Sequence, residues 1–109
     1  MDTHEAVDAL AALAQDTRLA AFRLLVAAGG DGHPAGAIAR RLDVPHNTLS
    51  THLAALHRAG LVQARRESRQ VIYAADTAGI RALLDFLLRD CCGGRPELCA
   101  PLPARRIPA

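Results

Sequence analysis

The sequence has no lysine, no tryptophan and only three aromatic residues among its 109 amino acids. All 13 basic side chains are therefore arginines. Without lysine, the chain cannot perform Schiff-base catalysis or form the phosphate-binding loop that requires a lysine. With so few aromatic rings, it is not expected to bind single-stranded nucleic acid by base stacking.

Long apolar runs are also absent. The longest, Ala9 to Ala14, has six residues, whereas a membrane-spanning helix needs roughly 20. No basic leader precedes an apolar stretch, so we expect a cytoplasmic protein with no secretory signal and no membrane partner. Three cysteines are too few, and odd in number, for a disulfide scaffold, and we expect them as thiols.

The net charge of +2 is unevenly distributed along the chain. Residues 1–39 carry −3, residues 40–69 carry +4 and residues 70–109 carry +1. This concentration of arginine in the middle third suggests a polyanionic partner. A solvated basic face is the alternative interpretation of the charge alone.

Apolar spacing predicts a mainly α fold with one β-hairpin. Period-two spacing appears only around Glu67-Ser68-Arg69, which predicts the hairpin. In the first helix the apolar stripe is expected at Val7, Leu10, Ala11 and Ala14, and in the second at Leu19, Phe22, Leu25 and Val26. The expected elements are helices from Thr3 to Ala14, from Asp16 to the glycines at 29–32, from Ala35 to Leu42, from His46 to Ala59 and from Thr77 to Asp90, and strands from Val62 to Arg66 and from Gln70 to Ala74.

The middle of the chain has the order of a winged helix-turn-helix. A short helix, the turn Asp43-Val44-Pro45 and a second helix are followed at once by the basic hairpin. In this arrangement the second helix enters the major groove of DNA and the hairpin arginines meet phosphates. We therefore expect double-stranded operator DNA as a partner.

The helix from His46 to Ala59 has two distinct faces. Leu49, Leu53 and Leu56 are spaced to pack inward, and polar residues occupy the opposite side. Asn47 is suited to adenine, although it is also a common helix cap, and His52 beside the leucines is better explained as a packed histidine. The candidate DNA-contacting residues are Arg40, Arg41, His46, Asn47, Ser50, Thr51, Arg58, Arg65, Arg66 and Arg69.

Three segments carry a resemblance to a known family: LAALAQDTRLAAFRLLV, VPHNTLSTHLAALHRAGLV and RRESRQVIYAAD. Together they resemble the ArsR/SmtB family of bacterial metal- and metalloid-responsive repressors over roughly residues 5–90. The resemblance implies a winged helix-turn-helix homodimer, formed through the first and fifth helices, that releases its operator when metal binds. The sequence departs from the family at Pro45, where a serine cap is usual, and at Ser68, where glycine is usual.

All three cysteines, Cys91, Cys92 and Cys99, fall within ten residues, in DCCGGRPELC. Soft thiolates favour thiophilic ions, and trivalent arsenic or antimony takes three sulfurs in a pyramid. Zinc would need a fourth ligand, such as Asp90 or His4. The resemblance agrees with the metalloids, because the chain is similar to the branch of the family with a Cys-Cys pair and a third cysteine beyond the fifth helix. A thiol redox or persulfide switch, another soft metal, and inert packing are the alternatives.

One pair of residues has the spacing of a catalytic loop. Cys99 and Arg105 have the spacing of a phosphatase or arsenate reductase loop, but Pro101 and Pro103 remove two amide donors that the loop needs. The sequence is thus interpreted as a non-enzymatic repressor that binds operator DNA when metal-free and dissociates on binding arsenite or antimonite, with no catalytic cofactor. Its expected domains are residues 1–92, for DNA binding and dimerisation, and a tail of residues 93–109.

Overall fold

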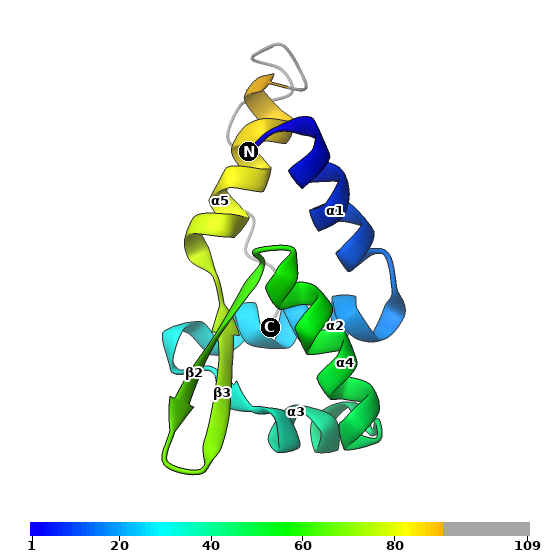
Figure 1. The fold of residues 1–109 in the computed structure, drawn as a ribbon, viewed down its shortest axis with the longest axis vertical. Helices are drawn as coiled ribbons and strands as arrows, with labels where there is room; N and C mark the ends of the chain where they lie inside the picture. Colours follow the sequence, from blue (N-terminus) through cyan, green and yellow to red (C-terminus); the bar gives the residue numbers. More distant parts are fainter. Residues whose placement is uncertain (91–109) are drawn as a thin grey trace.

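The computed structural model describes residues 1–90 as helices arranged around a small antiparallel sheet. Helices α1 (Thr3–Leu13) and α5 (Thr77–Asp85) lie toward one end of the molecule, and α3 (Ala35–Leu42), the start of α4 (His46–Arg58) and the hairpin turn lie at the other (Figure 1). This arrangement confirms the predicted winged helix-turn-helix. The elements in order are α1 (Thr3–Leu13), α2 (Asp16–Ala28), the 3-10 turn η1 (Gly29–Asp31), β1 (His33–Pro34), α3 (Ala35–Leu42), α4 (His46–Arg58), β2 (Val62–Glu67), β3 (Gln70–Ala75), α5 (Thr77–Asp85) and the π-helical turn η2 (Phe86–Asp90).

The sheet has the strand order β1-β3-β2. The predicted hairpin is present, with register from Val62 opposite Ala75 to Glu67 opposite Gln70. The short strand β1 was not predicted, because two residues are too few to show a period. Its proline is tolerated because β1 lies at the edge of the sheet, where a missing N–H breaks no inner ladder.

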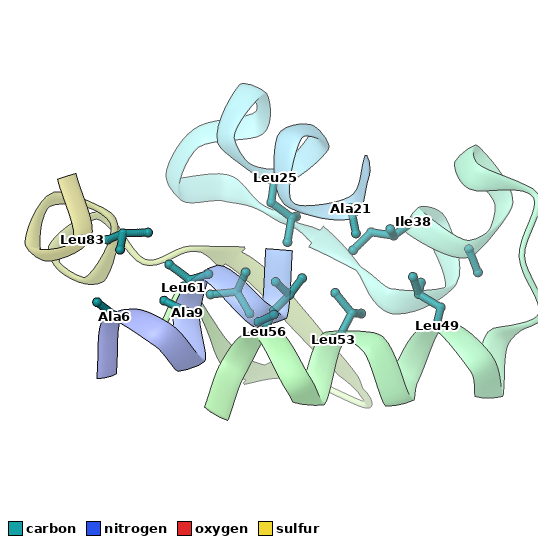
Figure 2. Close-up of a cluster of buried hydrophobic side chains, with 13 residues drawn as sticks. Ala6, Ala9, Ala21, Leu25, Ile38, Leu49, Leu53, Leu56, Leu61 and Leu83 are labelled. Atoms are coloured by element: carbon teal, nitrogen blue, oxygen red, sulfur yellow. The ribbon is translucent and has the colours of Figure 1, made fainter. Parts of the chain in front are cut away.

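The core is built on the leucine face of α4. Leu49, Leu53 and Leu56 are fully buried, as predicted. They point toward α2 and α3, where Leu25 and Ile38 are also fully buried (Figure 2). Burying a leucine or isoleucine side chain contributes about 1.5–3 kcal/mol. This layer therefore holds the helix-turn-helix unit together.

The structure corrects the predicted inner faces of α1 and α2. In α1, the three buried residues are the alanines Ala6, Ala9 and Ala12. Four of the larger side chains that we expected inside are outside: Val7 and Leu10 are 57% and 42% exposed, and in α2 Leu19 and Val26 are 43% and 49% exposed. Ala11 and Ala14 are exposed as well. In α2 the other two predicted residues do face inward, since Leu25 is fully buried and Phe22 is half-buried. The buried face of α1 consists of small residues, and such a close contact has no room for larger ones.

Helix boundaries differ from the predictions by one residue or less, except at the end of α5. That helix is α-helical only to Asp85 and continues as the π-helical turn η2. At the start of α1, Asp2 and Glu5 form a reciprocal capping box. Within residues 1–90, no helix combines the length and the apolar character that crossing a bilayer requires.

The loop that joins α2 to β1 depends on two glycines with similar, glycine-specific backbone angles. Gly29 has φ 69° and ψ −156°, and Gly32 has φ 64° and ψ −164°. They differ in their surroundings. A Cβ at Gly32 would overlap the carbonyl oxygen of Tyr73, whereas nothing lies within 4 Å of a Cβ at Gly29. Gly32 thus allows the loop to press against β3.

This pair gives a controlled test of the close approach. Gly29→Ala is expected to lower the free energy of unfolding through backbone strain alone, by about 1–3 kcal/mol. Gly32→Ala adds the overlap with β3 and is expected to cost about 1–3 kcal/mol more. Urea unfolding followed by circular dichroism measures both values. Equal losses in the two variants would show that the contact with Tyr73 does not constrain the loop.

Candidate nucleic-acid interface

The turn between α3 and α4 is fixed by backbone hydrogen bonds. Asp43 adopts a left-handed conformation, with φ 55°, and its N–H donates to the carbonyl oxygens of Ala39 and Arg40 at the end of α3. Asp tolerates this conformation better than most residues. Pro45 then precedes α4, and within residues 1–90 no side chain forms an N-cap hydrogen bond to that helix. The N-terminal turn of α4, which also carries polar side chains, is therefore not closed by a capping side chain.

The outer face of α4 presents the polar residues predicted from the sequence. His46, Asn47 and Thr51 are exposed and Ser50 is half-buried. Asn47 Oδ1 accepts a hydrogen bond of 2.9 Å from the Thr48 N–H, and the Thr51 hydroxyl donates to the Asn47 carbonyl at 3.2 Å. Asn47 therefore has a local hydrogen bond at the start of the helix, and adenine recognition stays a prediction. Its oxygen serves the first turn of the helix, while its amide nitrogen has no hydrogen-bond partner within residues 1–90.

A concavity of about 420 Å³ joins the start of α4 to the hairpin. It brings together His46 and Ser50 of α4 and Arg69 of the hairpin, which are three of the predicted contact residues. Side chains that can form hydrogen bonds lie here beside a guanidinium group, as a surface that meets both bases and phosphates requires. The other residues that line it are Pro34, Ala35, Gly36, Gln70, Val71 and Tyr73.

Four of the predicted arginines lie on α3 and in the hairpin and have no compensating negative charge among residues 1–90. Arg40 and Arg41 lie in the last turn of α3, and Arg66 and Arg69 lie in the hairpin. All four are exposed, and none has an ion-pair partner among residues 1–90. Such arginines are suited to phosphate groups.

Arg65 and Arg58 are placed differently from the other predicted contacts. The Arg65 guanidinium binds the η1 turn and Glu67. Arg58 is the last residue of α4, about 16 Å along the helix from Asn47, and it lines hollows with Asp8 and Glu5 of α1. The structure therefore does not bring Arg58 to the end of α4 where the other contacts gather.

His52 of α4 is half-buried, as expected for a packed histidine, and its Nδ1 has no hydrogen-bond partner within residues 1–90. Ser68 adopts φ 56°, the left-handed conformation for which the family uses glycine. Cys91, Cys92 and Cys99 lie outside the described residues. Within residues 1–90, no three His, Cys, Asp or Glu residues are grouped to hold a metal ion.

The chain is similar to known transcriptional regulators. A helix-turn-helix domain model matches residues 13–63. The transcriptional activator HlyU of Vibrio cholerae is 33% identical over 88 residues, which cover 81% of this chain and 79% of HlyU. A solved structure described as reduced HlyU from this organism has a TM-score of 0.64 at 32% identity, covering 83% of this chain and 92% of the other.

Two other solved structures have a similar fold over most of this chain. An ArsR-like transcriptional regulator from Rhodococcus sp. RHA1 has a TM-score of 0.73 at 29% identity and covers 89% of both chains. A homodimeric winged helix-turn-helix DNA-binding domain from Mycobacterium bovis, described as a possible ArsR-family regulator, has a TM-score of 0.64 at 27% identity and covers 84% of this chain and 82% of the other. Together with the HlyU match and the arginine-lined surface of α3, α4 and the hairpin, these similarities establish that the chain belongs to the ArsR/HlyU-type family of winged helix-turn-helix transcriptional regulators.

Proposed function

We propose that the protein is a metalloid-responsive repressor that binds operator DNA when metal-free and releases it when arsenite or antimonite binds Cys91, Cys92 and Cys99. The observation that carries this proposal is that all three cysteines of the chain lie at positions 91, 92 and 99, within the nine residues that follow η2 in the sequence. Three thiolates supply a complete ligand set for a trivalent metalloid, and binding displaces their protons.

A homodimer through α1 and α5 is part of this proposal. Val7 and Leu10 of α1 and Leu84 of α5 are 57%, 42% and 51% exposed. Both helices lie at the end of the molecule away from the hairpin turn (Figure 1). Exposed apolar side chains in such numbers favour burial against a second copy. The relative from Mycobacterium bovis is described as homodimeric, which supports a dimeric assembly.

A close backbone contact gives the dimer interface a route to the DNA-binding helix. A Cβ at Gly79 in the first turn of α5 would overlap the carbonyl oxygen of Gly60, two residues after α4 ends. The backbones therefore touch directly, with no side chain between them to absorb a displacement. A ligand that shifts α5 would change the position of α4, provided that it binds one dimer geometry more tightly than another.

A thiol redox or persulfide switch on the same cysteines is the second candidate. It is favoured by one observation, the relative whose structure is described as reduced HlyU. HlyU is also named as an activator, so repression is the part of our proposal that promoter fusions must test. The two candidates share the fold and the dimer and differ in the chemistry at the cysteines.

The dimer proposal predicts different outcomes for two equally exposed apolar residues. Leu84→Glu in α5 is expected to dissociate the dimer, because it places a carboxylate in the interface. Val26→Glu is the matched control, because Val26 of α2 is 49% exposed against 51% for Leu84 and lies outside the proposed interface. Sedimentation velocity at micromolar concentration measures the state. A monomeric unsubstituted protein would refute the dimer.

The proposed base readers should control sequence preference. Asn47→Ala and Thr51→Ala are expected to broaden the sequences selected from a pool of randomised duplexes, since a good bidentate base contact discriminates by about 1–3 kcal/mol. Arg58→Ala, at the other end of α4, is the control and should select the same sequences as the unsubstituted protein. An unchanged selection by both Asn47→Ala and Thr51→Ala would remove them from base recognition.

The metalloid proposal is tested with serine substitutions. Each single Cys→Ser variant should bind promoter DNA normally and lose part or all of its release by arsenite, followed by fluorescence anisotropy under reducing anaerobic conditions. The triple variant should not respond. Release of the triple variant at the same arsenite concentration as the unsubstituted protein would place the sensor elsewhere. Release by diamide but not by arsenite would favour the redox candidate.

A further inference from the structure

Arg65 is the most extensively bound side chain of the hairpin. Its Nη1 donates to the carbonyl of Gly30 at 3.0 Å, its Nη2 to the carbonyl of Asp31 at 2.9 Å, and its Nε to Glu67 Oε2 at 2.7 Å. All three nitrogens of the guanidinium are engaged. The two carbonyls lie in η1, at the end of the helical run that begins with α2. Carbonyls at a helix end have no partner within the helix, and a basic side chain commonly satisfies them.

The pleat of the hairpin sends Arg65 and Arg66 to opposite faces. Arg65 pairs across the ladder with Ile72, and Arg66 pairs with Val71. Cross-strand partners share a face, and consecutive residues do not. Val71 lines the concavity beside α4, whereas Ile72 is buried. Arg66 therefore shares the face of the DNA-binding concavity, and Arg65 faces η1.

The ion pair with Glu67 also changes the charge of the hairpin turn. Glu67 directly precedes Ser68 at the turn, where a free carboxylate would repel phosphate. Its pairing with Arg65 offsets that charge within the hairpin. Arg66 and Arg69 are left as the uncompensated cations of this segment among residues 1–90.

The partner of Arg65 belongs to the same framework that holds α4. The loop containing η1 is pressed onto β3 at Gly32, and α2 packs through Ala21 and Leu25 into the core that carries the leucines of α4. We propose that Arg65 is a positioning residue for DNA binding, which clamps the hairpin to η1 so that Arg66 and Arg69 lie at a fixed distance from α4, and that it makes no phosphate contact itself. This inference does not depend on the proposed metalloid response.

A lysine substitution distinguishes the clamp from a phosphate contact. If Arg65 clamps the hairpin, Arg65→Lys weakens DNA binding, whereas if Arg65 contacts phosphate, Arg65→Lys preserves it. Lysine keeps the charge but lacks the planar fork that reaches two carbonyls and a carboxylate at once. Arg65→Lys and Arg65→Ala are both expected to weaken binding roughly threefold to tenfold, the usual effect of losing such hydrogen bonds. Neither should change the slope of log affinity against log salt. Arg66→Ala and Arg69→Ala should each reduce that slope by about one for each bound subunit, which is about two for a dimer, and Arg66→Lys should largely preserve binding.

The measurement uses the full chain and a fluorescein-labelled mixed-sequence duplex of about 30 base pairs, long enough for two half-sites. Nitrogen relaxation of the Ser68 and Arg69 amides in the free protein should show larger motion in both Arg65 variants and no change in Arg66→Ala. Urea unfolding of each variant separates this local release from a general loss of stability, which would move the unfolding midpoint.

Two results would overturn the inference. If Arg65→Ala lowers the salt slope by about one for each bound subunit while Arg65→Lys binds like the unsubstituted protein, Arg65 is a phosphate contact. If both variants keep the original affinity, slope and amide motion, the clamp has no role in binding. Failure of the arsenite response in the same protein bears on the proposed function alone.

Discussion

The packing of three leucines from α4 against α2 and α3 is the interaction on which the rest of the structure depends. Leu49, Leu53 and Leu56 are fully buried on one face, so the opposite face, with Asn47 and Thr51, must be turned to solvent. Because the chain has only three aromatic residues, this aliphatic layer supplies much of the core. A single packing constraint therefore both stabilises the fold and turns the polar residues of the candidate interface to solvent.

The two ends of the molecule have different chemistry. One end carries α1 and α5, with exposed apolar side chains such as Val7 and Leu84, and the other carries α3, the start of α4 and the hairpin turn, with uncompensated arginines (Figure 1). A surface suited to self-association is thus kept away from a surface suited to a polyanion. The direct contact between Gly79 and Gly60 connects these two regions through backbone, which makes the separation compatible with regulation of one surface from the other.

The hairpin shows why counting basic residues overestimates a binding surface. Arg65, Arg66 and Arg69 are indistinguishable by composition, yet Arg65 holds two carbonyls and a carboxylate, while Arg66 and Arg69 have no ion-pair partner among residues 1–90. The period of two in a strand already requires Arg65 and Arg66 to face opposite sides. That signal was available in the sequence. The two carbonyl acceptors of Arg65 could not be found from the sequence, because they lie 34 and 35 residues earlier in the chain.

The sequence by itself determined the features that depend on neighbours along the chain. The order of the elements, the bounds of α3, the leucine face of α4 and the presence of the hairpin follow from local periods, caps and turns. Only the tertiary structure decided which apolar face of α1 is buried, the presence of β1, and the separate placements of Arg58 and Arg65. These depend on how closely distant segments approach: alanines fit between α1 and the core where Val7 and Leu10 do not, and Gly32 admits β3 where a side chain would collide.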